Sequence, residues 1–347
     1  MNEEKNKSAI GSTLPPDAAW LAKQVPEAII EPDLPIVDPH HHLWDRANHR
    51  YLLDELLADT RSGHRVEATV FVECTAFYRA DGPAEMRPVG ETEFVNGVAA
   101  MSASGFYGPM QACAGIVGHA DLLRGASAKQ VLQALIAAGN GRFRGIRHAG
   151  GWDASKDIRN SHTNPPQGLY GRADFRDGFA QLAPLGLSFE AWQYHTQLPD
   201  VIDLARAFPS TSIILNHVGG PLGVGPYAGR TEETYAFWKR HIVELASCPN
   251  VSVKLGGLGM RIGMVDFHAR ATPPTSAQIA EAWQPWIEPC IEAYGASRCM
   301  FESNFPVDNY TSSYAVLWNA FKRLAQGASP AEKSALFAGT AKRVYRL

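Results

Sequence analysis

The chain has 347 residues, of which 45% are hydrophobic and 19% charged, and its formal net charge is -3. This composition is typical of a globular protein with a large core, and a single α/β barrel commonly reaches this length. Lysine and arginine do not cluster, which argues against nucleic acid or an anionic membrane as a partner and favours a small-molecule substrate. The five scattered cysteines predict reduced thiols and a cytoplasmic location.

Residues 1–35 are predicted to form an irregular N-terminal arm, because the segment 13–35 holds five prolines and shows little periodicity. The first residues mix both charges and lack an apolar run, so we expect no signal peptide. No apolar run approaches the roughly twenty residues that a membrane span needs. The proline-rich arm and the surplus of tryptophans favour a homodimer or pairing with a related subunit.

Residues 36–347 are predicted to form one distorted (β/α)8 barrel of the TIM type. The first strand leads from Ile36 into a run of three histidines. Seven further apolar, strand-like runs follow at intervals of a few tens of residues, at 68–74, 111–118, 143–148, 187–195, 212–217, 251–255 and 299–305.

Helix-period segments separate these runs. In 129–138 and 314–324 the apolar residues fall on one stripe, which is the pattern of an amphipathic helix. Alternating buried strands and helices favour a closed parallel barrel. A doubly wound open sheet is the alternative, but no glycine-rich phosphate loop follows the first strand.

Long loops rich in glycine and proline follow several of the strands, at 75–92, 150–172, 219–233 and 257–276. In a barrel, loops that follow strands lie at the C-terminal face, where active sites are built. We therefore expect the functional site at that face.

Polar residues gather where the predicted strands end. His40 and His42 stand two residues apart on the first strand, so their side chains point to the same side. Polar groups converging in an apolar barrel mouth are costly to bury without a chemical role, and imidazole is a ligand for zinc, iron and manganese. The candidate metal ligands are His40, His42, Glu73, His148, His195 and His217, and the candidate catalytic residues are Arg147, Lys254, Glu302, Asn304 and Asp308.

The chain resembles the amidohydrolase superfamily, in its amidohydrolase-related branch of metal-dependent hydrolases and lactonases. The matching pieces are DPHHHLWD, VFVEC, RGIRH, YHTQLPD, ILNHVGGP, VSVKLGGLG, CMFESNFPVD and GTAKRVYRL, in the order of the family. The resemblance implies a (β/α)8 barrel with one metal, two metals or, in some lactonases, none. By resemblance, His40 and His42 correspond to the ligands of the first strand, and His195 and His217 to the histidines of strands five and six.

One departure from the family concerns the eighth strand, where the family has an aspartate that binds metal and takes a proton from water. This chain has Asn304 there, and an amide is no general base and a poor ligand. Three carboxylates are candidate replacements: Glu302, Asp308 and Glu73.

Three functions are compatible with this pattern. The first is a hydrolase in which a divalent metal, zinc above all, activates water against a small carboxylate-bearing lactone or amide, with Arg147 and Lys254 binding the anionic group. The second is a monooxygenase that hydroxylates a small substrate with two metal ions, iron paired with iron or manganese, in which Glu73 is a ligand. The third is a non-catalytic partner subunit that keeps the fold.

Overall fold

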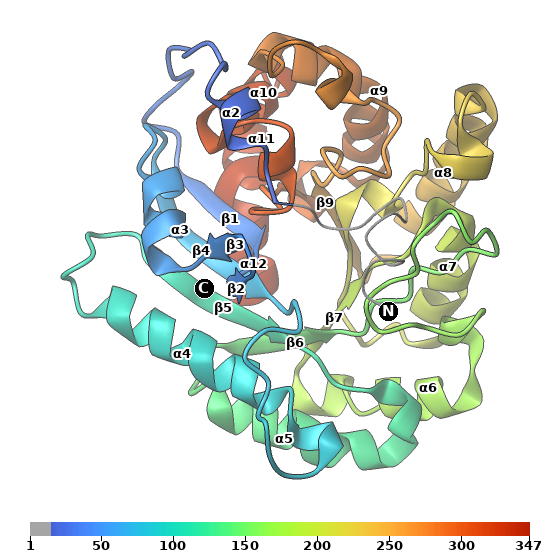
Figure 1. Cartoon of the computed structure of the whole chain (residues 1–347). Coiled ribbons are helices and arrows are strands. Elements are labelled where there is room, and N and C mark those ends of the chain that lie inside the picture. The colour runs from blue at the N-terminus through green and yellow to red at the C-terminus, as the bar shows by residue number, and fades with distance from the viewer. Residues whose placement is uncertain (1–14) are drawn as a thin grey trace.

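A computed structural model describes residues 15–347 (Figure 1). Eight parallel strands follow one another around a single sheet in chain order. The strands are β1 Ile36–His41, β4 Val66–Val72, β5 Gln111–Gly118, β6 Phe143–Arg147, β7 Ser188–Ala191, β8 Ile213–Leu215, β9 Val251–Leu255 and β10 Cys299–Phe301. The predicted barrel is thereby confirmed.

The barrel closes between its first and last strands. A parallel bridge joins His41 and Phe305, and the amides of His42 and Asn304 donate to the carbonyls of Phe305 and His40 at 2.8 and 2.9 Å. Closure removes the two open sheet edges, and it draws the residues that follow β10 next to the histidines of β1.

Helices surround the strands on the outside (Figure 1). They are α3 Leu53–Thr60, α4 Val89–Ala103, α5 Ala128–Ala138, α6 Ala173–Phe179, α7 Leu198–Ala207, α8 Thr231–Ala246, α9 Ser276–Tyr294, α10 Tyr314–Leu324, α11 Pro330–Ser334 and α12 Thr340–Tyr345. Helix α10 shows why the periodicity predicts these elements: its apolar stripe, with Leu317 and Phe321, is buried against the barrel, and Ser313 caps its first turn.

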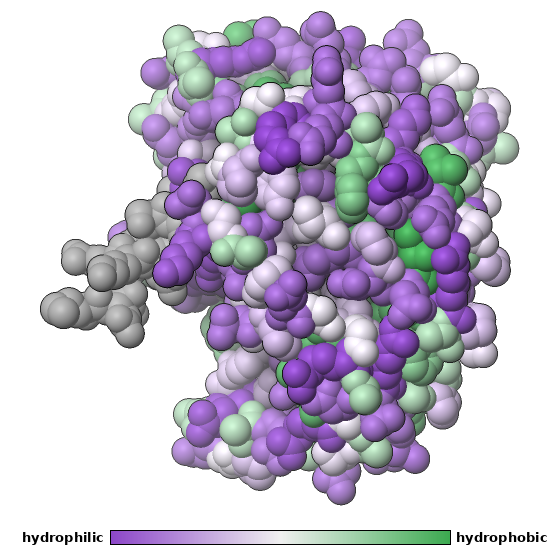
Figure 2. All heavy atoms as spheres, turned by 90° about the vertical axis from the view of Figure 1, so that its right-hand side faces the viewer, coloured by the Kyte–Doolittle hydropathy of each residue, from purple (hydrophilic) through white to green (hydrophobic). Residues whose placement is uncertain are grey.

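Two apolar layers form the core. The larger lies between the sheet and the helices, and the smaller fills the inside of the barrel with Val37, Val70, Ile214, Met300 and Tyr345. Tyr345 belongs to α12, so the end of the chain packs into the barrel interior. On the face shown in Figure 2, polar residues dominate and apolar ones are scattered in small groups.

The part of the N-terminal arm that the structure describes, 15–35, contains the one-turn helix α2 Ala18–Leu21 and is otherwise without regular structure. It packs on the outside of the barrel, where Trp20 Nε1 donates to the carbonyl of Arg270 and Lys322 Nζ to that of Glu31. Residues 1–14 of the predicted arm lie outside the described residues. Within 15–347, no helix is long and apolar enough to cross a bilayer.

Candidate metal centre and cavity

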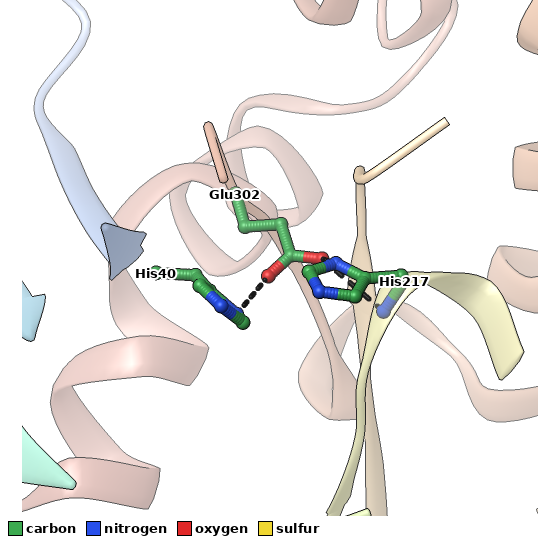
Figure 3. A group of neighbouring side chains, drawn as sticks. All are labelled: His40, His217 and Glu302. Carbon is green, nitrogen blue, oxygen red and sulfur yellow. Dashed lines mark hydrogen bonds and ion pairs between the residues drawn. The ribbon is translucent and has the colours of Figure 1, made fainter. Parts of the chain in front are cut away.

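His40, His217 and Glu302 meet at the carboxyl ends of β1, β8 and β10 (Figure 3). The Glu302 carboxylate points between the two imidazoles, with Oε1 2.7 Å from His217 Nδ1 and Oε2 2.7 Å from His40 Nδ1. One ligand atom from each residue can be chosen so that all three lie within 4.8 Å of one another. All three side chains are buried, so the group forms a polar centre inside an apolar barrel.

The chemistry of this group fits a divalent cation. Glu302 Oε2 is buried, and its contact with His40 lacks hydrogen-bond geometry, which leaves the oxygen without a donor among residues 15–347. Burial and the nearby Lys254 hold the pKa of His40 well below its usual range, and burial and Arg147 do the same for His217. Neutral imidazoles and a carboxylate oxygen are the donor set that zinc and other transition metals accept.

The local backbone is shaped to hold the centre. His217 and Asn304 have φ of 52° and 55°, a left-handed conformation that is uncommon outside glycine. Gly257, with φ of 68°, faces the imidazole so closely that a Cβ atom there would lie 2.2 Å from His217 Nδ1. Gly256, the preceding residue, likewise lies against Glu302. The centre therefore requires glycine at both positions after β9, because a side chain at either would collide with one of its residues.

His42 lies beside this group, with its ring centroid 5.0 Å from that of His40. Its Nδ1 donates to the carbonyl of Val72 at 2.7 Å, which leaves Nε2 as the free acceptor. A histidine held in this way by a backbone carbonyl is the usual form of a metal ligand. His42 is therefore a candidate for a further ligand.

The two predicted anion-binding cations are each paired with a buried carboxylate. Arg147 Nε donates to Glu73 Oε1 at 2.6 Å, and Lys254 Nζ lies 2.9 Å from Glu190. Burial raises the pKa of Glu302 to about 8 despite Lys254, so this carboxyl needs a cation beside it to be ionised at neutral pH. Glu73 and Glu190 balance the charges of Arg147 and Lys254. Glu190 was not predicted, although a charged residue inside an apolar strand signals a buried partner.

Glu73 and the Asn304–Asp308 pair have their polar atoms engaged. The second oxygen of Glu73 accepts from His162 Nε2 at 3.0 Å. Asn304 Nδ2 donates to Asp308 Oδ1 at 2.8 Å, and the amide of Gly259 donates to Asp308 Oδ2 at 3.1 Å. Burial raises the pKa of Asp308 to about 8.

The structure does not bring His148 and His195 into the group. His148 Nδ1 accepts from the amide of Leu122, and His195 Nδ1 accepts from the amide of Leu222. His148 packs against Phe175 and His195 against Tyr227. Nδ1 of each histidine is thus bound to a backbone amide outside the metal centre. The residue pattern at strand ends could not predict these hydrogen bonds.

A cavity of about 320 Å³ opens beside the centre at the C-terminal face. His42, Arg147, His217 and Asn304 line it, together with residues of the loops after β6 and β9. Three further arginines in its wall were not predicted: Arg46, Arg159 and Arg261. Arg46 stacks over Trp44 and donates to the carbonyl of Cys74, and within 15–347 none of the three guanidinium groups is paired with a carboxylate.

A parallel (β/α)8 barrel that gathers imidazoles and a carboxylate beside a cavity at the ends of its strands belongs to the class of barrel enzymes. More particularly, the chain belongs to the amidohydrolase family, because the sequence model of that family matches residues 37–347. The predicted family is confirmed.

Similar proteins and solved structures are consistent with this family. Uncharacterized protein y4mH of Sinorhizobium fredii is 34% identical over 337 residues, 91% of this chain and 99% of its own length. L-Fucono-1,5-lactonase of Burkholderia multivorans is 28% identical over 235 residues, 67% of this chain and 72% of that protein. An amidohydrolase crystal structure from Burkholderia multivorans with bound zinc has a TM-score of 0.69 and 25% identity, over 90% of this chain and 99% of that one.

Proposed function

We propose that this amidohydrolase opens the ring of a small anionic lactone, with one divalent metal ion held by His40, His217 and Glu302. The observation that carries the proposal is the buried centre beside an arginine-lined cavity. Zinc is the first candidate metal, because a solved relative contains it. Bound there, a divalent metal supplies a Lewis acid and lowers the pKa of a water molecule.

The protein residues have separate tasks in this proposal. Glu302 orients both imidazoles, because each of its oxygens faces one ring, and its carboxylate would supply the negative charge of the centre to a bound cation. Lys254 and Arg147 keep the imidazole of His40 neutral by their positive charge. Lys254 Nζ lies 3.3 Å from His40 Nδ1, and Arg147 Nη1 lies 3.4 Å from His40 Nε2.

The arginines of the cavity wall support an anionic substrate. Arg46, Arg159 and Arg261 bring positive charge to one small cavity without paired carboxylates among the described residues. Burial and the repulsion of Arg159 lower the pKa of Arg46, so these cations gain from an anion that enters between them. A carboxylate on the substrate fits the charge of the cavity, and a lactone fits the relative that is named as a lactonase.

Arg159→Gln and Arg261→Gln test the substrate charge. We expect each to raise KM for 2-pyrone-4,6-dicarboxylate, a dianionic lactone, by about tenfold or more, because a charge-assisted hydrogen bond is worth roughly 1.5–3 kcal/mol. KM for L-fucono-1,5-lactone, which is neutral, should change little. Steady-state kinetics with both lactones measures the difference.

The matched control is Arg206→Gln, which removes an exposed guanidinium paired with Glu244 on the outside of the barrel. It should leave both KM values unchanged. Equal effects of the cavity variants on the neutral and dianionic lactones would contradict the anionic substrate.

Two other functions have less support. The monooxygenase hypothesis needs Glu73 as a ligand, and both Glu73 oxygens are engaged by Arg147 and His162. The hypothesis of a non-catalytic subunit leaves the arginines of the cavity without a role. We therefore propose neither.

A further inference from the structure

His162 and Glu73 form a hydrogen-bonded pair in the wall of the cavity. His162 Nε2 lies 3.0 Å from Glu73 Oε2, and the imidazole side chain is 25% exposed whereas Glu73 is fully buried. The histidine comes from the loop between β6 and α6, and the glutamate directly follows β4. The imidazole lines the same cavity as His217 and Asn304.

The pair is built so that the carboxylate is ionised. Burial alone would raise the pKa of Glu73, but His162 and Arg147 outweigh it and hold that pKa well below its usual range. Arg147 donates two hydrogen bonds to Glu73, from Nε to Oε1 and from Nη2 to the backbone carbonyl, both at 2.6 Å. An ionised carboxylate accepts only, so His162 Nε2 must carry the proton that is shared with it.

This arrangement fixes the tautomer of the imidazole. With a proton on Nε2, the neutral ring has its lone pair on Nδ1, and no other residue of 15–347 forms a hydrogen bond with that nitrogen. A histidine oriented on one side by a buried carboxylate and free on the other is the arrangement of a general base. The carboxylate also stabilises the imidazolium that forms when Nδ1 takes up a proton.

The cavity otherwise lacks such a base among the described residues. Asn304 is an amide, Asp308 binds Asn304 and Gly259, and Glu302 lies between two imidazoles. The nitrogens of His42 and His217 are engaged at Nδ1 by Val72 and Glu302. His162 is therefore the histidine whose free nitrogen is not part of the metal centre.

We propose that His162 is a catalytic general base and acid, and that Glu73 is its positioning residue. This inference rests on the proposed lactone hydrolysis. The water oxygen bonds to the lactone carbonyl carbon, its proton passes to Nδ1, the bond from that carbon to the ring oxygen breaks, and the proton passes to that oxygen. One lactone and one water give one hydroxy acid, and the imidazole ends as it began.

The first experiment needs no substrate. Nitrogen-15 NMR of the full chain labelled at histidine reports which ring nitrogen carries the proton, and His162→Gln assigns the signal by its loss. We expect the Nε2–H tautomer for neutral His162. The Nδ1–H tautomer would overturn the proposal, whatever the substrate is, because Nδ1 could then accept no proton.

The second experiment uses 2-pyrone-4,6-dicarboxylate and L-fucono-1,5-lactone as probes. We expect His162→Gln to lower kcat by about 100-fold or more, with KM and metal content unchanged, since general base catalysis contributes 10²–10⁴-fold. The fall of kcat toward acid pH that we expect in the parent should be weaker in His162→Gln. Added imidazole should restore part of the rate of this variant. Around His162 the other titratable and charged groups are Glu73, Arg147, His119 and His148.

The matched control is His241→Gln, because His241 lies on α8 and bonds the carbonyl of Phe237. It should leave kcat and its pH profile unchanged. A kcat of His162→Gln within threefold of the parent would overturn the role of His162. If the parent hydrolyses neither lactone, the proposed function fails, and the tautomer still decides whether the pair is arranged as a base.

Discussion

At the scale of single residues, Glu91 shows how a buried carboxyl sets the response to pH. It lies on α4, where Oε1 accepts from the amides of Cys74 and Ala76 at 3.0 and 2.8 Å. Burial, helped by the charge of Glu73, raises the pKa of Glu91 to about 8. The folded protein therefore binds a proton at neutral pH that the unfolded chain has released.

We predict that the free energy of unfolding falls as pH rises between about 4.5 and 8, because the unfolded chain loses the proton of Glu91 in this range whereas the folded protein keeps it. Its stabilising effect is complete below the unfolded pKa and is lost as pH approaches the raised folded pKa, with a slope of up to about 1.4 kcal/mol per pH unit. Glu91→Gln should remove this slope, because its amide cannot titrate.

Urea unfolding at several pH values measures the difference between parent and variant. Glu93→Gln is the control, because Glu93 lies on the same helix but is exposed and paired with Arg79. An unchanged slope in Glu91→Gln would show that this carboxyl is ionised in the folded protein.

The residue scale also shows what sequence could predict at the centre. His40, His217 and Glu302 were candidates because their residue types stand at strand ends, and the structure places them together. The partners of Arg147 and Lys254 were not foreseen, since each pair joins different strands across the barrel. His162 sits in a long loop whose path no periodic pattern specifies.

At the scale of elements, the sequence predicts the helices α5 and α10 closely and places all eight barrel strands, although the runs predicted for β7 and β10 end four residues too late. These elements carry strong apolar periodicity because one face or both are buried. The hairpin of β2 Trp44–Arg46 and β3 His49–Tyr51 was missed, because such short, mostly polar strands show no clear alternation. The hairpin matters, since Trp44 and Arg46 belong to the cavity wall.

The turn after β9 supplies an element-scale prediction. Gly257→Ala places a methyl group 2.2 Å from the present position of His217 Nδ1, at φ of 68°. We expect the imidazole to move away from Glu302, so that metal affinity falls by about tenfold or more. Isothermal titration of metal-stripped protein with zinc measures this loss.

Gly295→Ala is the matched control for that substitution. Gly295 has φ of 72°, but no atom of the described residues lies within 4 Å of the added carbon. Both variants should lose roughly 1–3 kcal/mol of stability through backbone strain, but the control should bind zinc like the parent. Equal zinc affinity in both variants would contradict the account of the turn.

At the scale of the whole molecule, barrel closure and the end of the chain hold the centre in place. Closure between β1 and β10 sets Glu302 beside His40, and β8 adds His217. From inside the barrel, the Tyr345 hydroxyl donates to Glu190, which is paired with Lys254. Residues from the beginning, middle and end of the sequence thus support one small group.

The central claim is that this group binds one divalent metal ion, and elemental analysis of the full chain purified without chelator tests it most directly. We predict about one divalent metal per chain in the parent and its loss in Glu302→Gln, because the amide removes the negative charge from between the imidazoles. Full metal occupancy in Glu302→Gln, or a parent that binds no metal even when zinc is supplied, would contradict the account.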